Sequence, residues 1–195
     1  MPALLSEASQ NPELWSVDAP KPGVNMQIAQ VKYNGAPAVL QLTPKSELGG
    51  ITTPWTPNAF RGTGAESRVT ITMNVPERVR EELELCEDAV RTALKAYLPS
   101  ADSLWHSSTK PGESHPSTLR AKILIAGERA CPCMDVDGNR VAMPTDWSGL
   151  VVLPMLYVRA AYIQKSIAGL ILEVTTLIVG ERKALKPTVA RATFV

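Results

Sequence analysis

Aromatic residues are scarce in this sequence, and neither sign of charge is in excess. Four Trp, four Tyr and two Phe are the only aromatic residues among 195. Twenty Lys and Arg stand against nineteen Asp and Glu, which gives a formal net charge of +1. This balance excludes a highly basic nucleic-acid coat protein, and the totals give no support to an acidic solvating tail. An electrostatic partner would therefore have to bind a local patch of charge.

Cysteines and long apolar runs are also few. The three cysteines are an odd number without the spacing of a secreted disulfide scaffold, so we expect a reducing compartment. The first residues lack the basic segment of a signal peptide. Charged residues divide the most apolar stretch, 147–179, into runs shorter than the roughly 18 residues that cross a bilayer. We expect an intracellular protein, in the nucleus or the cytoplasm, without a membrane partner.

The sequence lacks the motifs that usually carry catalytic or metal chemistry. It has no P-loop, no dinucleotide-binding glycine pattern, no HExxH zinc motif and no kinase element. Cys131 and Cys133 lie closer together than the paired ligands of structural zinc sites usually do. Ser107 and Ser108 follow His106 without a nucleophile elbow or an orienting acid. We therefore expect a non-enzymatic protein without a cofactor.

Turn-forming residues shape the first part of the chain. Residues 1–25 contain prolines spaced so that they predict a surface arm without regular elements. Two apolar runs, 26–33 and 36–43, flank an Asn-Gly pair, which is typical of a hairpin turn because both residues can take positive φ. The next segment, 44–66, is rich in proline and glycine and predicts a long exposed loop.

A strand and a helix follow. Residues 68–75 alternate polar and apolar side chains with period two, which predicts a half-buried strand. Pro76 ends this strand and stands at a favoured first position for a helix. The helix is expected to bury an apolar stripe with steps of three and four and to show its acidic residues to solvent. The apolar stripe consists of Val79, Leu83, Cys86, Val90, Ala93 or Leu94, and Tyr97.

From residue 119 onward the chain is mostly strand-like, with a second hairpin turn at Asp137 and Gly138. Strands on both sides of one helix, without βαβ alternation, favour an antiparallel barrel or sandwich. We expect a mainly β protein with one inserted helix, forming a single antiparallel β-barrel with long loops. Its predicted parts are an N-terminal arm (1–25), a barrel domain (26–186) and a C-terminal tail (187–195).

Basic residues gather toward the C-terminus. Residues 119–195 hold ten Lys and Arg against six Asp and Glu, whereas 67–118 hold six against eight. In a β-barrel, basic side chains with nearby aromatic rings can follow a phosphate backbone while the rings stack on bases. The candidate nucleic-acid-binding residues are Lys32, Tyr33, Trp55, Phe60, Arg61, Arg120, Lys122, Arg159, Tyr162, Lys165, Arg182 and Lys183.

The order of these elements resembles that of the single OB-fold, single-stranded-DNA-binding proteins of podophages. The resemblance spans residues 26–181 and rests on the Asn-Gly hairpin, the strand that runs into a helix, the turn at Asp137 and Gly138, the Ser148-Gly149 step and the final strand pair. The segment 32–37, Lys-Tyr-Asn-Gly-Ala-Pro, is also similar to proteins of large DNA viruses of eukaryotes.

This resemblance implies an OB-fold that binds single-stranded DNA in its groove, without sequence preference, during replication, recombination or repair. The phage proteins end in an acidic tail with a terminal aromatic residue. Here Phe194 is present but the acidic residues are not, so recruitment of partners through the tail is not implied. The alternative is a structural or assembly protein, virion-like or an oligomer-forming β-sandwich, since low net charge favours self-association.

Overall fold

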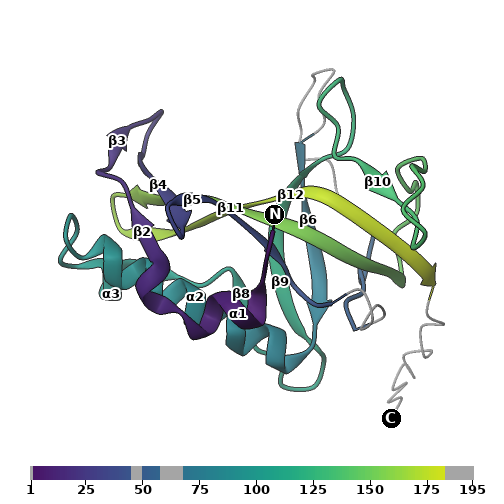
Figure 1. Cartoon of the computed structure of the whole chain (residues 1–195), viewed down its shortest axis with the longest axis horizontal. Coiled ribbons are helices and arrows are strands. Elements are labelled where there is room, and N and C mark those ends of the chain that lie inside the picture. The colour runs from purple at the N-terminus through teal and green to yellow at the C-terminus, as the bar shows by residue number, and fades with distance from the viewer. Residues whose placement is uncertain (1, 45–49, 58–67, 183–195) are drawn as a thin grey trace, which may run out of the picture.

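A computed structural model describes residues 2–44, 50–57 and 68–182, and Figure 1 shows its helices and strands. The helices are α1 (Leu5–Gln10), α2 (Glu77–Leu94) and α3 (Ala101–Leu104), with a 3-10 turn at Pro12–Leu14. The strands are β1 (Ala3–Leu4), β2 (Trp15–Val17), β3 (Lys21–Pro22), β4 (Gln27–Tyr33), β5 (Ala36–Gln41), β6 (Arg68–Val75), β7 (Trp105–His106), β8 (Thr109–Lys110), β9 (Ser117–Leu124), β10 (Cys133–Met134), β11 (Leu150–Gln164) and β12 (Ile167–Arg182).

The strands form an open mixed sheet. The prediction is therefore wrong in the closure of the barrel, in the purely antiparallel pairing and in the single helix. The main path of the sheet is β1-β5-β4-β11-β12-β9-β6. Strands β9 and β12 pair in parallel, as do β1 and β5. Among the described residues no pairing of β1 with β6 closes the path. Alternation along the chain shows which residues face inward, but it does not show which strands become neighbours.

The β11–β12 hairpin connects the two halves of the sheet. The two strands pair antiparallel over their whole length, with register irregularities that bend them. On its other side, β11 pairs with both β4 and β5. Thr52 forms single bridges to Asn74 of β6 and to Val151 of β11. In the described part of the chain, the sheet therefore curls around the core with only the single bridges of Thr52 between β6 and β11.

The predicted strand 68–75 and both predicted hairpin turns are confirmed. In β6 the apolar residues Val69, Ile71, Met73 and Val75 are all buried. Asn34 and Gly35 join β4 to β5 with φ angles of 49° and 71°, as a two-residue hairpin turn requires. At the second turn, Gly138 has a φ of 88°, and the Asp135 amide donates to the Asn139 carbonyl oxygen at 2.9 Å.

Helix α2 forms where the sequence predicts it, but its acidic surface differs from the prediction. Val79, Leu83, Cys86, Val90 and Leu94 are buried as expected. Tyr97 is 49% exposed, because the helix ends at Leu94 and its stripe does not reach that residue. Glu87 was expected in solvent and is 2% exposed. Its carboxylate lies against the segment that carries β7 and β8, where it accepts hydrogen bonds.

The N-terminal residues contribute to the core, although the prolines predicted an arm without regular elements. Leu5 and Ala8 of α1 are fully buried. The Trp15 indole donates to the Ala8 carbonyl oxygen at 3.0 Å, and its ring centroid lies 5.1 Å from that of Tyr33. Figure 1 shows α1 beside α2, both below the sheet. In the described part of the chain, no helix has the length and apolar character needed to cross a membrane.

Candidate functional site

A groove runs over the outer face of the sheet. In β9, Leu119, Ala121 and Ile123 point into the core, so the alternate residues Arg120 and Lys122 point outward. Three adjoining hollows lie on this face, and Lys122 lines all three. The largest has a volume of about 840 Å³. We call these hollows together the outer groove. Its basic and aromatic residues are Trp55, Arg68, Arg120, Lys122, Arg129, Tyr157, Arg159 and Tyr162.

Strand register places one polar row across the groove. Lys122 of β9 is paired with Thr70 of β6, and its ammonium group donates to the Thr70 hydroxyl at 2.7 Å. On its other side Lys122 is in register with Glu173 of β12, which is paired with Tyr157 of β11. Burial lowers the pKa of Lys122, and the positive charges of Arg68 and Arg120 lower it further. The cations Arg68 and Arg120 therefore lie near this row, which itself holds one cation and one carboxylate.

Glu173 lies between two arginines of the groove. Its carboxylate accepts a hydrogen bond from Arg159 Nη1 at 2.9 Å and forms an ion pair with Arg68 Nη2. The pKa of Arg68 is lowered, mainly by burial and then by the charge of Arg159. Among the described residues that line the outer groove, Glu173 is the one acidic side chain. One carboxylate thus reduces the repulsion between two guanidinium groups.

The aromatic rings of the groove come from different elements. Trp55 is 52% exposed and lines one of the three hollows together with Thr72 and Arg120. Tyr162 lines the hollow that contains Trp55 and also the largest hollow, and it is paired with Gly169 across the hairpin. A Cβ atom at Gly169 would lie 3.0 Å from the Tyr162 hydroxyl and 2.8 Å from the His106 carbonyl oxygen. Glycine at this position therefore lets the Tyr162 ring lie close to the backbone of β12.

The structure brings together five of the predicted binding residues. Trp55, Arg120, Lys122, Arg159 and Tyr162 all line the outer groove, although they come from a loop and two strands. Three others, Phe60, Arg61 and Lys183, lie outside the described residues.

The remaining four predicted residues do not line the outer groove. Lys32 forms an ion pair with Asp18 at 2.7 Å, and Tyr33 packs against Trp15. Lys165 lies exposed in the turn between β11 and β12. Arg182 forms an ion pair with Asp146 at 2.7 Å at the end of β12. These residues share charge or aromatic character with the groove residues but not their position.

Four charged or aromatic residues of the groove were not among the predicted binding residues. Arg68 is the first residue of β6. The alternation of polar and apolar side chains along this strand predicted its buried residues, and the same alternation places Arg68 on the outward face. Tyr157 and Glu173 lie within apolar runs of β11 and β12, where only the pairing shows that they are opposite each other. Arg129 reaches the groove from the segment after β9, and no sequence pattern indicates this.

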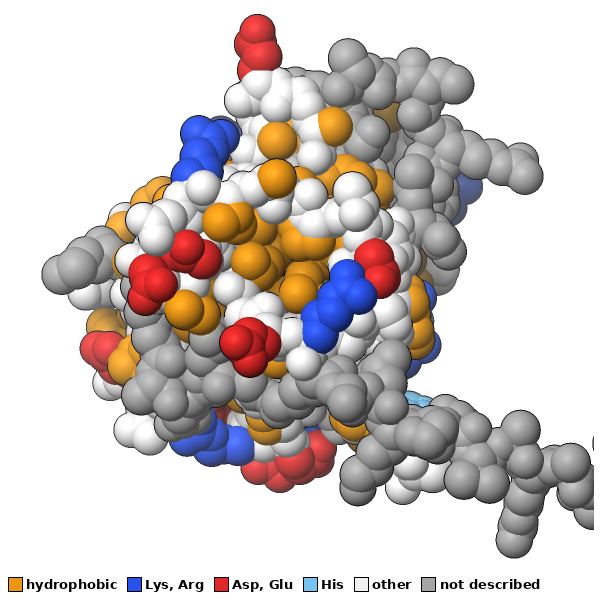
Figure 2. Space-filling view, turned by 90° about the vertical axis from the view of Figure 1, so that its right-hand side faces the viewer, with side chains coloured by type: hydrophobic (Ala, Val, Ile, Leu, Met, Phe, Trp, Pro, Cys, Tyr) orange, Lys and Arg blue, Asp and Glu red, His pale blue; other side chains and the backbone are white. Residues whose placement is uncertain are grey.

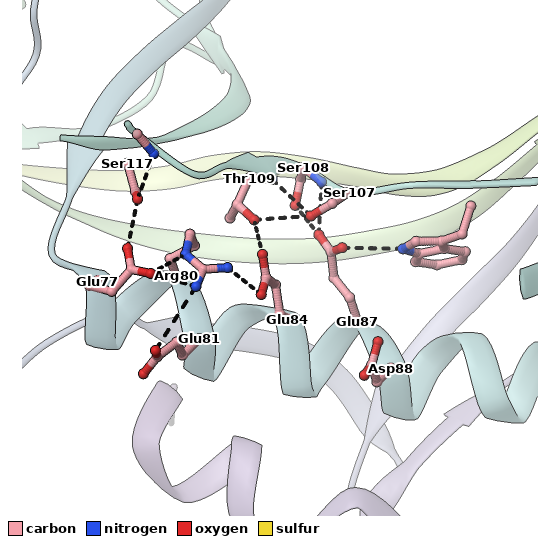
Figure 3. Close-up of polar contacts among 12 residues, drawn as sticks. Glu77, Arg80, Glu81, Glu84, Glu87, Asp88, Ser107, Ser108, Thr109 and Ser117 are labelled. Carbon is pink, nitrogen blue, oxygen red and sulfur yellow. Dashed lines mark hydrogen bonds and ion pairs between the residues drawn. The ribbon is translucent and has the colours of Figure 1, made fainter. Parts of the chain in front are cut away.

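A second polar cluster lies on the sheet side of α2 (Figure 3). Glu87 Oε1 accepts from the Ser108 backbone N–H at 2.9 Å and from the Ser108 hydroxyl, and its Oε2 accepts from the Trp105 indole at 3.2 Å. Glu84 accepts from the Thr109 hydroxyl at 3.2 Å, and Glu77 from the Ser117 hydroxyl at 2.8 Å. These bonds fasten the segment 105–117 to the helix, so Ser108, which was considered above as a nucleophile, has a structural partner.

The three cysteines are buried, and none of them forms a disulfide bond. Burial raises the pKa of Cys86 and of Cys131 to about 12 in each case. The described residues contain no group of three or more His, Cys, Asp and Glu side chains that could hold a metal ion.

Figure 2 shows the end of the molecule that is on the right in Figure 1. Hydrophobic side chains gather in the centre of this view, and charged side chains of both signs stand around them. The mixed signs contrast with the outer groove, where five basic side chains accompany one acidic one. The concentration of basic residues is therefore a property of the groove and not of the whole surface.

No protein-family model matches the sequence, and no curated protein matches it. The structure is similar to the crystal structure of gp2.5, a single-stranded DNA binding protein encoded by bacteriophage T7, with a TM-score of 0.50 and 12% sequence identity. The match covers 73% of this chain and 95% of that chain. This likeness concerns the fold. It supports the phage-type fold that the resemblance implied, with an open mixed sheet in place of a closed barrel.

Proposed function

We propose that this protein binds single-stranded DNA in the outer groove, without catalysing a reaction, and that it acts in replication, recombination or repair. The observation that carries the proposal is the groove itself, in which five basic side chains and three aromatic rings line one face of a curved sheet. The gp2.5 protein, whose fold is similar, is a single-stranded DNA binding protein. We place the chain with the phage and viral proteins of this kind.

The basic side chains suit the phosphates of a strand. Arg120 and Lys122 stand on β9, Arg68 on β6 and Arg159 on β11, so cations from three strands line one continuous path. Binding of a single strand to such a path releases condensed counterions, and affinity then falls with salt by about 0.7 log units per decade for each phosphate contact. Affinity is therefore expected to fall steeply as salt rises.

The aromatic rings suit unpaired bases. Trp55, Tyr157 and Tyr162 line hollows that also contain the apolar side chains of Ile28 and Ile171. Stacking of one base on one ring contributes about 1 to 3 kcal/mol, and every base offers a face for it. In a duplex the bases are already stacked and paired, so the rings favour a single strand over a duplex.

The experiment is a fluorescence titration with an oligothymidylate of about 20 nucleotides at low salt. Trp15 and Trp147 are buried while Trp55 is exposed in the groove, so Trp55 should give most of the quenching, and Trp55→Phe should remove it. Tyr162→Ala should weaken binding about fivefold or more, as expected for one lost stack. A duplex of the same length should bind more weakly. Absence of quenching and of any complex at micromolar protein would refute the proposal.

A further inference from the structure

We propose that Glu173 is an internal substitute for phosphate: it holds Arg68 and Arg159 in the free protein and gives them up to a phosphate of the bound strand. This inference rests on the proposed function, because it concerns the same groove. It makes Glu173 a residue that lowers both the affinity and the salt dependence of the site.

The placement of Glu173 supports this role. Two guanidinium groups reach one carboxylate, with Arg159 Nη1 2.9 Å from Oε1 and Arg68 in an ion pair with the same oxygen. Both arginine side chains stay accessible, at 43% for Arg68 and 52% for Arg159. A carboxylate and a phosphate offer similar pairs of acceptor oxygens to arginine. A phosphate arriving from solvent can therefore replace the carboxylate on the exposed sides of the same groups.

The exchange has a cost that a groove without this carboxylate would not have. In the free protein, Glu173 compensates the charge of the two arginines, so fewer counterions gather around them. After the exchange, the bound phosphate must lie near the displaced carboxylate, which has the same sign of charge. Removal of the Glu173 charge should then add about one counterion-releasing contact. For a single strand, that contact steepens the salt dependence by about 0.7 log units per decade, which corresponds to about fivefold tighter binding at 0.1 M salt.

The test compares Glu173→Gln with Glu81→Gln. Glutamine keeps the size of the side chain and one acceptor oxygen, so Arg68 and Arg159 retain a partner. Glu81 lies on α2 with a side chain that is 62% exposed, and its substitution changes the net charge by the same amount away from the groove. Affinity for oligothymidylate is measured from 0.05 to 0.3 M salt. We expect Glu173→Gln to bind about fivefold more tightly at 0.1 M and with a steeper slope, and Glu81→Gln to match the wild type.

Inorganic polyphosphate, which has no bases, is the second probe. Glu173→Gln should bind it more tightly than Glu81→Gln does. If no variant binds oligothymidylate but this difference in polyphosphate binding is seen, the proposed function fails and the role of Glu173 stands. Equal affinities of the two variants for polyphosphate, including no binding by either, overturn the role of Glu173. Weaker binding of Glu173→Gln to either probe also overturns it, because the carboxylate would then be needed to position the arginines.

Discussion

Glu87 of α2 is the residue whose replacement should most clearly reveal how the helix is attached to the sheet. It is 2% exposed, and its two oxygens accept from the Trp105 indole N–H, the Ser108 backbone N–H and the Ser108 hydroxyl. Glu87→Ala leaves the two N–H groups without this acceptor, at about 1 to 3 kcal/mol each. Trp105 and Ser108 are half-buried, so water reaches part of each donor. We therefore expect a loss at the lower end, about 2 kcal/mol.

The measurement is urea unfolding followed by far-UV circular dichroism, with a thermal scan beside it. For a chain of this length, a loss of about 2 kcal/mol corresponds to a fall in Tm of about 4 to 8 °C. Glu87→Gln keeps one acceptor oxygen and turns an amide N–H₂ toward the remaining donor, so it should lose about half as much. Glu81→Gln on the exposed side of α2 is the control and should change the free energy of unfolding little. A loss below about 0.5 kcal/mol for Glu87→Ala would refute the attachment described above.

Three further predictions concern the thiols, a glycine and a carboxylate. Burial raises the pKa of Cys86 and Cys131 to about 12 from 9.0. These thiols therefore contribute stability below pH 9 that is lost as the pH rises toward 12. A thiol titration at pH 8 should label them only after the protein is unfolded. Gly169→Ala should lower both Tm and DNA affinity, because its Cβ would meet the His106 carbonyl oxygen and the Tyr162 ring; an unchanged affinity in a binding titration would contradict this. The pKa of Asp146 is lowered, first by the Ser148 backbone N–H and then by Arg182. The contribution of Asp146 to stability is therefore present above pH 3.8 and lost as the pH falls below it. Asp146→Asn should make the urea midpoint less dependent on pH below 3.8.

Local patterns were enough to predict the elements that depend on neighbours in the chain. The period-two alternation of residues 68–75 and the helical stripe after Pro76 both reappear as β6 and α2. The Asn34 and Gly35 turn also follows from local chemistry, because both residues take positive φ there. In each case the signal and the structure involve residues that are close in sequence.

The sheet and the candidate site depend on pairings between distant segments, and the sequence shows these only in part. The parallel pairing of Lys122 with Glu173 joins residues of two strands that a one-dimensional pattern cannot align. The list based on charge and aromatic character therefore included Lys32 and Arg182, which form ion pairs elsewhere. It omitted Tyr157, which reaches the groove only because β11 lies beside β12.

The central claim is that the outer groove holds the DNA strand, and two double variants with the same change of charge test it most directly. Arg120→Gln with Lys122→Gln removes two cations from the groove, and Lys32→Gln with Arg182→Gln removes two cations outside it. The measurement is the anisotropy of a labelled oligothymidylate at 0.1 M salt. Two lost phosphate contacts correspond to about 25-fold weaker binding at this salt concentration. The account predicts this loss for the groove variant and less than about threefold for the other; equal losses in both would contradict it.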